Sequence, residues 1–236
     1  LMDIKNIKKE FPIFKQKING KPLVYLDSAN SSQKPKVVID KISNFYETEF
    51  SNVGRSVHTL AVKATNRFEA TRDKVQKYLN AKHREEIIFT KGETESINLV
   101  ASSYGKKYFN KGDEILITEL EHHSNYVPWN FLRTEKGAVI KFAQVNEGGD
   151  VEIEEIKKLI TNKTKMIAIT HISNVTGAVL PITKIVDLAK EKNIPVLIDG
   201  TQGAPHSKID MQKIGCDFYA ISCHKMYGPN GLGILY

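Results

Sequence analysis

The sequence predicts an α/β protein with a mostly parallel β-sheet flanked by helices. Apolar runs alternate with amphipathic segments along most of the 236 residues, which is typical of parallel strands joined by crossover helices. Several runs, among them Met166-Ile167-Ala168-Ile169, are continuously apolar, as expected of strands that are buried on both faces. A hydrophobic content of 41% is enough for one large domain with a substantial core.

The expected strands are short apolar runs that end at polar or turn-forming residues. In chain order they are Leu23–Leu26, Ile87–Thr90, Glu114–Thr118, Ala138–Phe142, Met166–Thr170, Val196–Asp199, Phe218–Ser222 and Gly233–Tyr236. The expected helices are longer segments with apolar residues at helical spacing. In chain order they are Lys36–Thr48, Leu60–Leu79, Thr94–Tyr108, Tyr126–Glu135, Ile153–Ile160 and Ile182–Glu191. Glycine-rich and proline-containing turns separate these elements, at Gly112-Asp113, Gly148-Gly149 and Asn193-Ile194-Pro195.

The composition argues against two classes of protein. The net charge is +7, yet most basic residues are lysines spread along the chain, whereas nucleic-acid recognition relies on the planar fork of arginine. Mixed runs such as Glu154-Glu155-Ile156-Lys157-Lys158 are typical of solvated helix faces, so we expect no nucleic-acid partner. No stretch of about 18 apolar residues is present, which argues against a membrane span.

Two features favour a cytoplasmic protein. Residues 1–21 are rich in lysine and lack the apolar centre of a secretory signal. The two cysteines, Cys216 and Cys223, lie close together and form no zinc-binding pattern. So few cysteines in a chain of this size indicate a reducing compartment rather than a disulfide framework.

Polar side chains gather directly after several expected strands. Ligands of parallel α/β sheets bind beyond the carboxyl ends of the strands, so these loops are expected to meet at one rim. The loops are Lys91-Gly92-Glu93-Thr94, Glu121-His122-His123, Ser173-Asn174, Asp199-Gly200-Thr201-Gln202 and Ser222-Cys223-His224-Lys225. Neither a Gly-x-Gly-x-x-Gly loop nor a Walker loop accompanies them.

Such a set of groups suits pyridoxal-5′-phosphate (PLP). A partly desolvated lysine can lose its proton and form an imine with the cofactor's aldehyde, and an acid pairs with the pyridine nitrogen. Lys225 follows a strand and precedes a glycine-rich turn, and is the expected imine lysine; a surface lysine is the alternative interpretation. Asp199 ends an apolar strand and is the expected acid, although a helix N-cap would also suit it.

The other candidates have weaker signals. Thr94 and Glu95 lie between a strand and a helix, where free amides and the helix dipole favour an anion such as phosphate; ordinary helix capping is the alternative. Gln202 could bind the ring hydroxyl or remain solvated. Asn174 could donate to a ring oxygen or form a turn. A ring-stacking role suits one histidine of the pair that begins at His122.

Metal binding and cysteine chemistry are not expected. The pair His122-His123 has no third ligand at a convincing spacing. Cys223 lies two positions before Lys225, but a small packing residue is the favoured interpretation over a nucleophile. Cys216 is expected in the core.

These segments together resemble the class V aminotransferase family and, within it, the cysteine desulfurases of the SufS type. The resemblance runs from about Tyr25 to Tyr236. It rests on Tyr25-Leu26-Asp27-Ser28-Ala29, Arg55-Ser56-Val57-His58-Thr59-Leu60, Thr94-Glu95-Ser96-Ile97-Asn98-Leu99-Val100, Glu121-His122-His123-Ser124-Asn125, Ser173-Asn174-Val175, Asp199-Gly200-Thr201-Gln202, and Ser222-Cys223-His224-Lys225 with Tyr227-Gly228-Pro229.

The resemblance implies the fold type I of PLP-dependent transferases, whose large domain has a mostly parallel sheet of the seven-stranded type. Residues 1–22 would form an N-terminal arm and residues 23–236 the PLP-binding large domain. The family's C-terminal small domain is expected to be absent from this chain.

The resemblance also implies roles for the candidate residues. Lys225 would be the Schiff-base lysine, and His122 the imidazole stacked on the ring. Asp199 would pair with the pyridinium nitrogen and Gln202 would bind the ring hydroxyl. Asn174 would lie near the ring oxygen and the substrate carboxylate. The implied phosphate ligands are Thr94, Ser222 and His224.

The implied activity is desulfuration of L-cysteine, with release of L-alanine and a persulfide on an enzyme cysteine that feeds iron–sulfur cluster assembly. The implied partners are L-cysteine or L-selenocysteine, a sulfur acceptor of the SufE or SufU kind, and a second copy in a homodimer. The alternatives are a selenocysteine lyase or other class V PLP enzyme, and a catalytically silent fragment of the PLP domain.

The sequence departs from the family in two places and lacks two functional residues. Gly54 and Ser56 stand where many relatives have His and Gly around the arginine, and Cys223 stands where Gly or Ala is usual. The family's nucleophilic cysteine and carboxylate-binding arginine belong to a C-terminal segment beyond these residues. We therefore expect the 236-residue chain alone to be inactive in persulfide formation.

Overall fold

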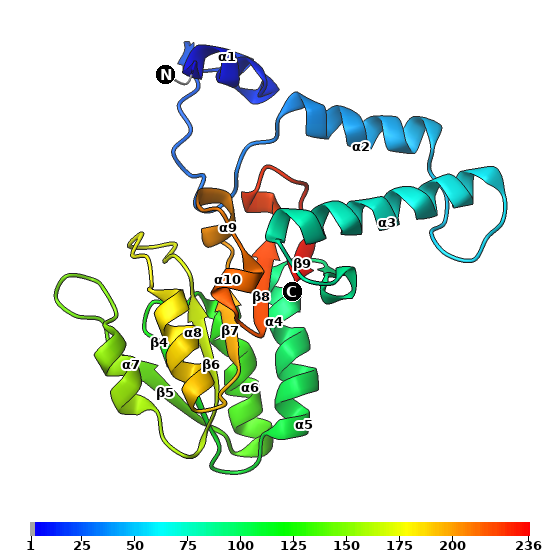
Figure 1. The fold of residues 1–236 in the computed structure, drawn as a ribbon. Coiled ribbons are helices and arrows are strands. Elements are labelled where there is room, and N and C mark those ends of the chain that lie inside the picture. Colours follow the sequence, from blue (N-terminus) through cyan, green and yellow to red (C-terminus); the bar gives the residue numbers. More distant parts are fainter. Residues whose placement is uncertain (1–2) are drawn as a thin grey trace.

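The structure is a computed structural model that describes residues 3–236, and it confirms the predicted α/β fold (Figure 1). A seven-stranded sheet has the order β3-β9-β8-β7-β6-β4-β5. All of its strands run in one direction except β9, which is antiparallel to both of its neighbours. The strands are β3 (Ile88–Thr90), β4 (Glu114–Thr118), β5 (Val139–Ala143), β6 (Thr164–Thr170), β7 (Val196–Asp199), β8 (Phe218–Ser222) and β9 (Gly233–Leu235).

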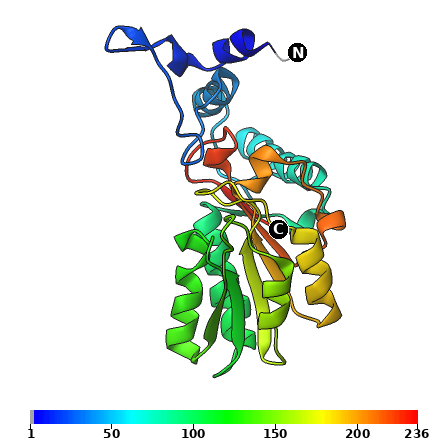
Figure 2. The same ribbon diagram turned by 90° about the vertical axis from the view of Figure 1, so that its left-hand side faces the viewer.

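Helices cover both faces of this sheet (Figure 2). The predicted helices are observed as α2 (Lys36–Thr48), α3 (Thr59–Leu79), α4 (Glu93–Val100), α6 (Val127–Lys136), α7 (Ile153–Leu159) and α8 (Ile182–Glu191). The predicted helix Thr94–Tyr108 continues from α4 through a π-helical segment, η3 (Ala101–Gly105), into α5 (Lys106–Tyr108). Short helices that we did not predict are α1 (Ile4–Lys9), α9 (Gly203–His206) and α10 (Met211–Ile214).

The central strands alternate their side chains between the two faces of the sheet. Ile167 and Ile198 belong to the apolar cluster that includes α7 and α8 residues. Ala168 and Leu197 belong to the cluster that contains Trp129 of α6. Both clusters exclude water, so apolar residues are favoured on both faces along Met166–Ile169 of β6 and Val196–Ile198 of β7, and burying each large one contributes about 1.5–3 kcal/mol. This arrangement explains why the runs in the sequence are continuous.

The predicted first strand, Leu23–Leu26, is wrong. These residues belong to no strand, and the side chain of Leu26 is 92% exposed. The observed strands lie just before them, as the hairpin β1 (Lys17–Ile18) and β2 (Lys21–Pro22). Asn19 and Gly20 join the two strands with positive φ angles, the conformation that favours an Asn-Gly turn in a hairpin. The Asn-Gly dipeptide therefore predicts the position of the strands better than the apolar run Leu23–Leu26 does.

The N-terminal residues stand apart from the sheet in both ribbon views (Figures 1 and 2). Residues 1 and 2 of the predicted arm (1–22) lie outside the described residues. Helix α2 has no buried side chain, although its apolar residues follow helical spacing. Its neighbour along the chain, α3, buries Leu79 in the core. No helix within residues 3–236 is both long and apolar enough to cross a membrane.

Candidate active site

A cavity of about 630 Å³ lies at the carboxyl ends of the parallel strands. Its wall includes all the residues that we expected around a cofactor, namely Thr94, Glu95, His122, Asn174, Asp199, Gln202, Ser222, His224 and Lys225. It also includes Lys91, Gly92, Glu93 and Thr201, which the sequence placed in the rim loops without a specific role. Residues of the wall that the sequence did not indicate are Asn30, Asn98, Thr170 and Ile172. The volume lies within the range of small-molecule sites.

Lys225 reaches the cavity from η5 (Cys223–Lys225), which begins directly after β8. The four preceding residues of β8 are buried, so the chain emerges from the core one turn before Lys225. The carbonyl oxygen of Cys223 accepts hydrogen bonds from the backbone N–H groups of Met226 and Gly228, both at 2.9 Å. These bonds close the turn around Lys225 and fix the direction in which its side chain leaves the backbone.

Asp199 is the last residue of β7 and Gln202 lies in the loop that follows, and both are buried. Asp199 Oδ1 accepts a hydrogen bond from the Thr201 N–H at 3.0 Å within the turn that follows β7. The N-cap of the next helix, α9 (Gly203–His206), is Gln202, so the alternative of Asp199 as a helix N-cap is wrong. Gln202 Nε2 donates to the carbonyl oxygen of Ala29 at 2.6 Å. The alternative of a solvated Gln202 is therefore wrong, because this side chain ties the loop to the N-terminal segment.

The first turn of α4 forms another side of the cavity. Backbone N–H groups at the start of a helix have no partner within the helix and attract anions. Thr94 is exposed there, while the Glu95 carboxylate accepts a hydrogen bond from the Lys91 N–H at 2.5 Å. A Cβ on Gly233 would lie 2.5 Å from the Cα of Gly92. The backbone of β9 therefore lies so close to this turn that only glycine fits at position 233.

Opposite this helix start, Ser222 Oγ and His224 Nδ1 are hydrogen-bonded at 2.7 Å. Burial is the largest cause that lowers the pKa of His224, and Lys225 lowers it further. The imidazole is therefore neutral at pH 7. A hydroxyl, a neutral imidazole and the free amides of α4 together form a donor set that is suited to a phosphate group.

His122 precedes η4 (His123–Asn125) and lines the cavity, whereas His123 is absent from its wall. His122 Nδ1 lies 2.5 Å from Ser124 Oγ. Burial lowers the pKa of His122, so this imidazole is also neutral at pH 7. A neutral, flat ring at this position can pack against the face of an aromatic ligand.

Two buried glutamates near the cavity were not assigned by sequence reasoning. Glu121 accepts hydrogen bonds from Thr118 Oγ1 and Asn125 Nδ2, each at 2.6 Å, and burial raises its pKa to about 8. Burial is the largest cause that raises the pKa of Glu93 to about 8, and the neighbouring Asp199 acts in the same direction. The available signal was a carboxylate three residues after the end of a strand, in loops that also carry expected cofactor residues.

Both cysteines lie outside the cavity wall. Burial raises the pKa of Cys216 to about 12 and that of Cys223 to about 11, so neither is a thiolate at neutral pH. Cys223 packs where a Cβ on Gly228 would meet it at 3.0 Å. Within residues 3–236, no group of three or more His, Cys, Asp or Glu side chains could hold a metal ion.

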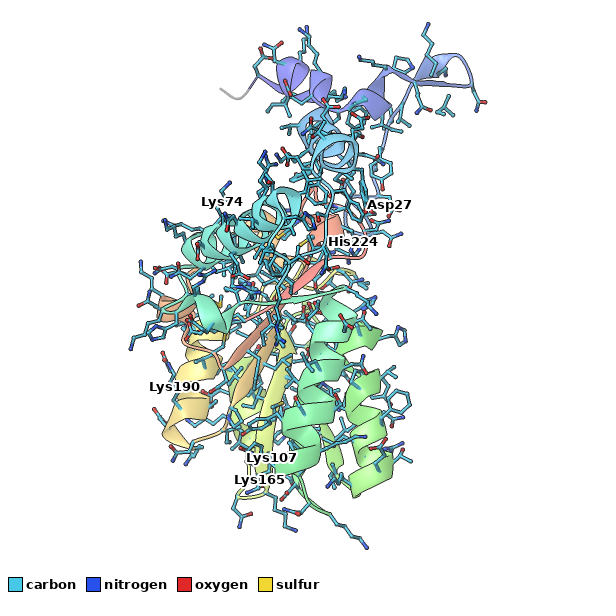
Figure 3. The ribbon with its side chains drawn as sticks, turned by 90° about the vertical axis from the view of Figure 1, so that its right-hand side faces the viewer. Asp27, Lys74, Lys107, Lys165, Lys190 and His224 are labelled. Carbon is cyan, nitrogen blue, oxygen red and sulfur yellow. The ribbon has the colours of Figure 1, made fainter. Side chains whose placement is uncertain are left out.

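The N-terminal segment completes the site from the outside. Ser32 Oγ donates to the His224 carbonyl oxygen at 2.9 Å and accepts from the Tyr227 N–H at 2.8 Å. Lys34 Nζ donates to the same carbonyl at 2.8 Å. Figure 3 shows His224 and Asp27 at one end of the sheet, whereas Lys107 and Lys165 mark the opposite end.

The donor set fits PLP. Two buried oxygens near the cavity, Thr201 Oγ1 and Glu93 Oε1, have no hydrogen-bond partner within the described residues. Buried polar atoms are nearly always paired in folded proteins, so a polar ligand is expected to contact this wall. Lys225, Asp199 and the phosphate-type donors supply the different groups that the cofactor requires.

The family model for aminotransferase class-V matches residues 24–236. The chain belongs to the class-V aminotransferase family. Class-V enzymes and the cysteine desulfurases among them are PLP-dependent, so the prediction of PLP as cofactor is confirmed at the level of the family. The family resemblance that we drew from the sequence is confirmed as well.

The relatives of this class-V chain are named cysteine desulfurases. A probable cysteine desulfurase of Halalkalibacterium halodurans is 48% identical over the whole chain, which spans 58% of that protein's length. The apo structure of a cysteine desulfurase from Thermococcus onnurineus NA1 has a TM-score of 0.92 and 32% identity, and the whole chain covers 57% of it. The cysteine desulfurase CsdA from Escherichia coli has a TM-score of 0.87 and 36% identity, and the whole chain covers 58% of it.

Proposed function

We propose that this chain is the PLP-binding part of a cysteine desulfurase of the SufS type. The reaction takes sulfur from L-cysteine, releases L-alanine and leaves the sulfur on a protein thiol as a persulfide. The observation that carries the proposal is the single cavity in which Lys225 and Asp199 lie together with the helix start of α4. The names of the similar proteins support cysteine as the substrate.

Lys225 is the proposed point of covalent attachment. Its amine lies in the cavity on a turn that is closed by backbone hydrogen bonds, so it is held in place before a ligand arrives. When bound, PLP supplies an electron sink for bonds at the α-carbon of an amino acid. The Lys225 amine would also be the base that moves a proton at that carbon, because it lies in the same cavity wall as Asp199 and His122.

Asp199 and His122 are proposed to hold the ring. Asp199 is 4% exposed, and a carboxylate in that position keeps a pyridine nitrogen protonated. His122 carries no charge at pH 7, so it can lie against the ring face without repelling that proton. Gln202 is proposed to contact the ring hydroxyl with its side-chain oxygen, since its nitrogen already binds Ala29.

The phosphate is proposed to bind between α4 and η5. Thr94, Ser222 and His224 face the same space as the amides of the first turn of α4. Glu95 contributes by capping, because its carboxylate is held by the Lys91 N–H rather than directed at an anion. Asn174, from the loop after β6, is proposed to lie near the ring oxygen and the substrate carboxylate.

The sulfur-accepting thiol is proposed to lie outside these 236 residues. Both cysteines of the chain are buried, protonated and away from the cavity. The chain spans 58% of the length of its relative from Halalkalibacterium halodurans, which leaves room for such a thiol in a longer protein. We therefore propose that the 236-residue chain alone forms no persulfide.

The remaining proposals concern organisation. Residues 1–22 are proposed to be an arm and residues 23–236 a PLP-binding large domain. A homodimer is proposed because helix α2 buries none of its apolar side chains, and because the side chain of Val57, in the loop after α2, is 92% exposed. A SufE- or SufU-type protein is the proposed sulfur acceptor, and the cytoplasm the proposed compartment.

Covalent attachment can be tested by borohydride reduction of the PLP-treated protein. We expect a visible absorbance band that borohydride abolishes, and a pyridoxyl mass on the peptide that contains Lys225. The variant Lys225→Ala should lose both signals. Lys91→Ala is the matched control, because Lys91 is the other lysine in the cavity wall. An adduct on Lys91, or no adduct at all, would contradict the proposal.

Substrate and thiol can then be tested with L-cysteine. The full-length protein should release L-alanine. In a single turnover, the number of alanine molecules released should equal the number of sulfur atoms bound to the protein. The 236-residue chain should take up PLP without forming a persulfide. Strong release of alanine and sulfide by the 236-residue chain would show that the missing thiol is not required.

A further inference from the structure

The carboxyl group of Glu121 joins three parts of the fold behind the cavity. Glu121 lies three residues after β4 and is absent from the cavity wall. Its Oε1 atom accepts hydrogen bonds from Thr118 Oγ1 at 2.6 Å and from the Thr170 N–H at 3.0 Å, at the ends of β4 and β6. Its Oε2 atom accepts a hydrogen bond from Asn125 Nδ2 at 2.6 Å. One side chain therefore ties two strand ends to η4.

These contacts enclose the loop that carries His122. Glu121 precedes this histidine and Asn125 follows it, so the hydrogen bond between their side chains closes the loop around it. The Asn125 N–H also donates to the His122 carbonyl oxygen at 2.8 Å. Within the loop, the Ser124 N–H donates to His122 Nδ1 at 3.3 Å. Ser124 thus holds the imidazole within the loop, and Glu121 holds the loop on the sheet.

Trp129 determines which way the Asn125 side chain points. The indole N–H of Trp129 donates to Asn125 Oδ1 at 3.1 Å, and an indole can donate but not accept through this atom. Both side chains are fully buried, so each polar atom needs a partner within the protein. The oxygen of the Asn125 amide therefore faces Trp129, and its nitrogen faces Glu121 as a donor.

The other two partners of Glu121 are donors as well. Thr170 donates through its backbone N–H. Thr118 Oγ1 already accepts a hydrogen bond from the Leu120 N–H at 3.1 Å, which leaves its own proton for Glu121. The side chain at position 121 must therefore accept hydrogen bonds at both of its terminal atoms. A carboxyl group does so even with a proton on Oε2, whereas the nitrogen of an amide accepts none.

We propose that Glu121 is a positioning residue for His122, because its carboxyl group clamps the His122 loop to the ends of β4 and β6. The clamp also fixes Thr170, which lies in the cavity wall together with His122. The use of this placement, to hold the ring of PLP, rests on the proposed function. The clamp itself does not, because it consists of hydrogen bonds within this chain.

The variant Glu121→Gln tests the clamp, because it keeps the shape of the side chain but turns an N–H group toward one of the donors. Amide hydrogen exchange of the cofactor-free, full-length protein, followed by mass spectrometry of its peptides, measures the effect. Peptides that contain η4 should exchange roughly tenfold faster than in the wild type, because a buried donor has lost its acceptor and the loop opens more often.

Glu114 provides a matched control on the same strand. It begins β4, at the end opposite to Glu121, and its side chain is also held by donors, Thr161 Oγ1 at 2.6 Å and Thr164 Oγ1 at 3.2 Å. Any effect of Glu114→Gln on exchange should be confined to peptides around Thr161, with η4 unchanged. This control separates loss of a hydrogen-bonded carboxylate from loss of the clamp.

A double variant, Glu121→Gln with Asn125→Asp, exchanges the positions of the amide and the carboxylate. The new carboxylate can accept from Trp129 and from the new amide N–H, while the amide oxygen accepts from Thr118 and Thr170. Exchange in η4 should return to within about twofold of the wild-type rate, because every donor again has an acceptor. The restored variant also guards against a failure of Glu121→Gln to fold. Unchanged exchange in Glu121→Gln, or no recovery in the double variant, would overturn the proposal.

Bound PLP gives a separate readout from the same proteins. The visible circular dichroism of the cofactor should weaken in Glu121→Gln and recover in the double variant, because the ring packs against a histidine that is held in place. Unchanged dichroism in Glu121→Gln, with PLP still attached to Lys225, would overturn the positioning role and leave the proposed function standing. Wild-type protein that shows the expected exchange but takes up no PLP would overturn the proposed function and leave the clamp standing.

Discussion

Helices α8 and α2 are both amphipathic, yet they lie in opposite environments. Helix α8 buries Ile182, Ile185, Val186 and Ala189 against the sheet. Helix α2 buries none of its residues. The same contrast separates the strands β6 and β7, whose apolar side chains are buried, from Leu26 and Val57, which are each 92% exposed. Periodicity thus predicts a helix reliably but does not reveal which surface its apolar face will contact.

The N-terminal residues are joined to the site by polar contacts and by one aromatic contact. Gln202 binds the Ala29 carbonyl, and Ser32 binds both His224 and Tyr227. The rings of Phe11 and Tyr227 meet edge to face, with their centroids 5.9 Å apart. The sheet core therefore depends on apolar area and close fit, whereas the N-terminal segment depends on a few directional bonds and one ring contact. Substitutions in the sheet core should therefore lower the free energy of unfolding by more than substitutions in the N-terminal segment.

The largest effect is expected in the core at Gly200. An added Cβ would lie 1.8 Å from the Tyr219 ring, and that ring is fully buried with its hydroxyl 2.8 Å from His171 Nδ1. Gly200→Ala should lower the free energy of unfolding by at least about 3 kcal/mol, because the ring cannot move aside. Urea denaturation measures this loss. Combining it with Tyr219→Ala, which empties the space, should give a loss smaller than the sum of the two.

A matched pair of leucines gives the most direct comparison of the two regions. Leu197 in β7 is fully buried, whereas Leu26 is 92% exposed. Leu197→Ala should cost about 3 kcal/mol of unfolding free energy through lost burial and a residual cavity. Leu26→Ala should change it by less than about 0.5 kcal/mol. Similar losses in denaturant titrations of both variants would mean that Leu26 is covered in solution.

A smaller effect is expected at the bond between the two regions. Ser32→Ala leaves the Tyr227 N–H without its partner and removes a donor to His224, which should cost about 1–2 kcal/mol. PLP affinity should also fall, because the backbone of His224 is held less firmly beside Ser222. Ser31→Ala is the control, since it keeps the backbone contact of that segment with Tyr25. Unchanged stability and PLP affinity in Ser32→Ala would refute the link.

Much of the site could be read from the order of residues. Each expected cofactor residue ends a strand, lies within four residues after one or lies in the first turn of α4, and parallel strands bring such positions to one rim. Glu93 and Glu121 occupy comparable positions, but their position alone gave them no role. Their significance depends on burial, and a glutamate beside a turn is exposed in most proteins. Gln202 was ambiguous for the same reason, since its partner Ala29 is far away in sequence.

The linear pattern of apolar residues determines the strands from Ile88 onwards, the helices between them and the rim at which Lys225 and Asp199 meet. It does so because burial on both faces of a parallel sheet demands continuous apolar runs, and the parallel strands, all except β9, bring their carboxyl ends to one rim. Only the tertiary structure decides that Leu26 stays exposed, that Ser32 supports His224, and that Glu93 is buried at the start of α4. Those outcomes depend on contacts between distant segments and on the exclusion of water, which no local pattern records.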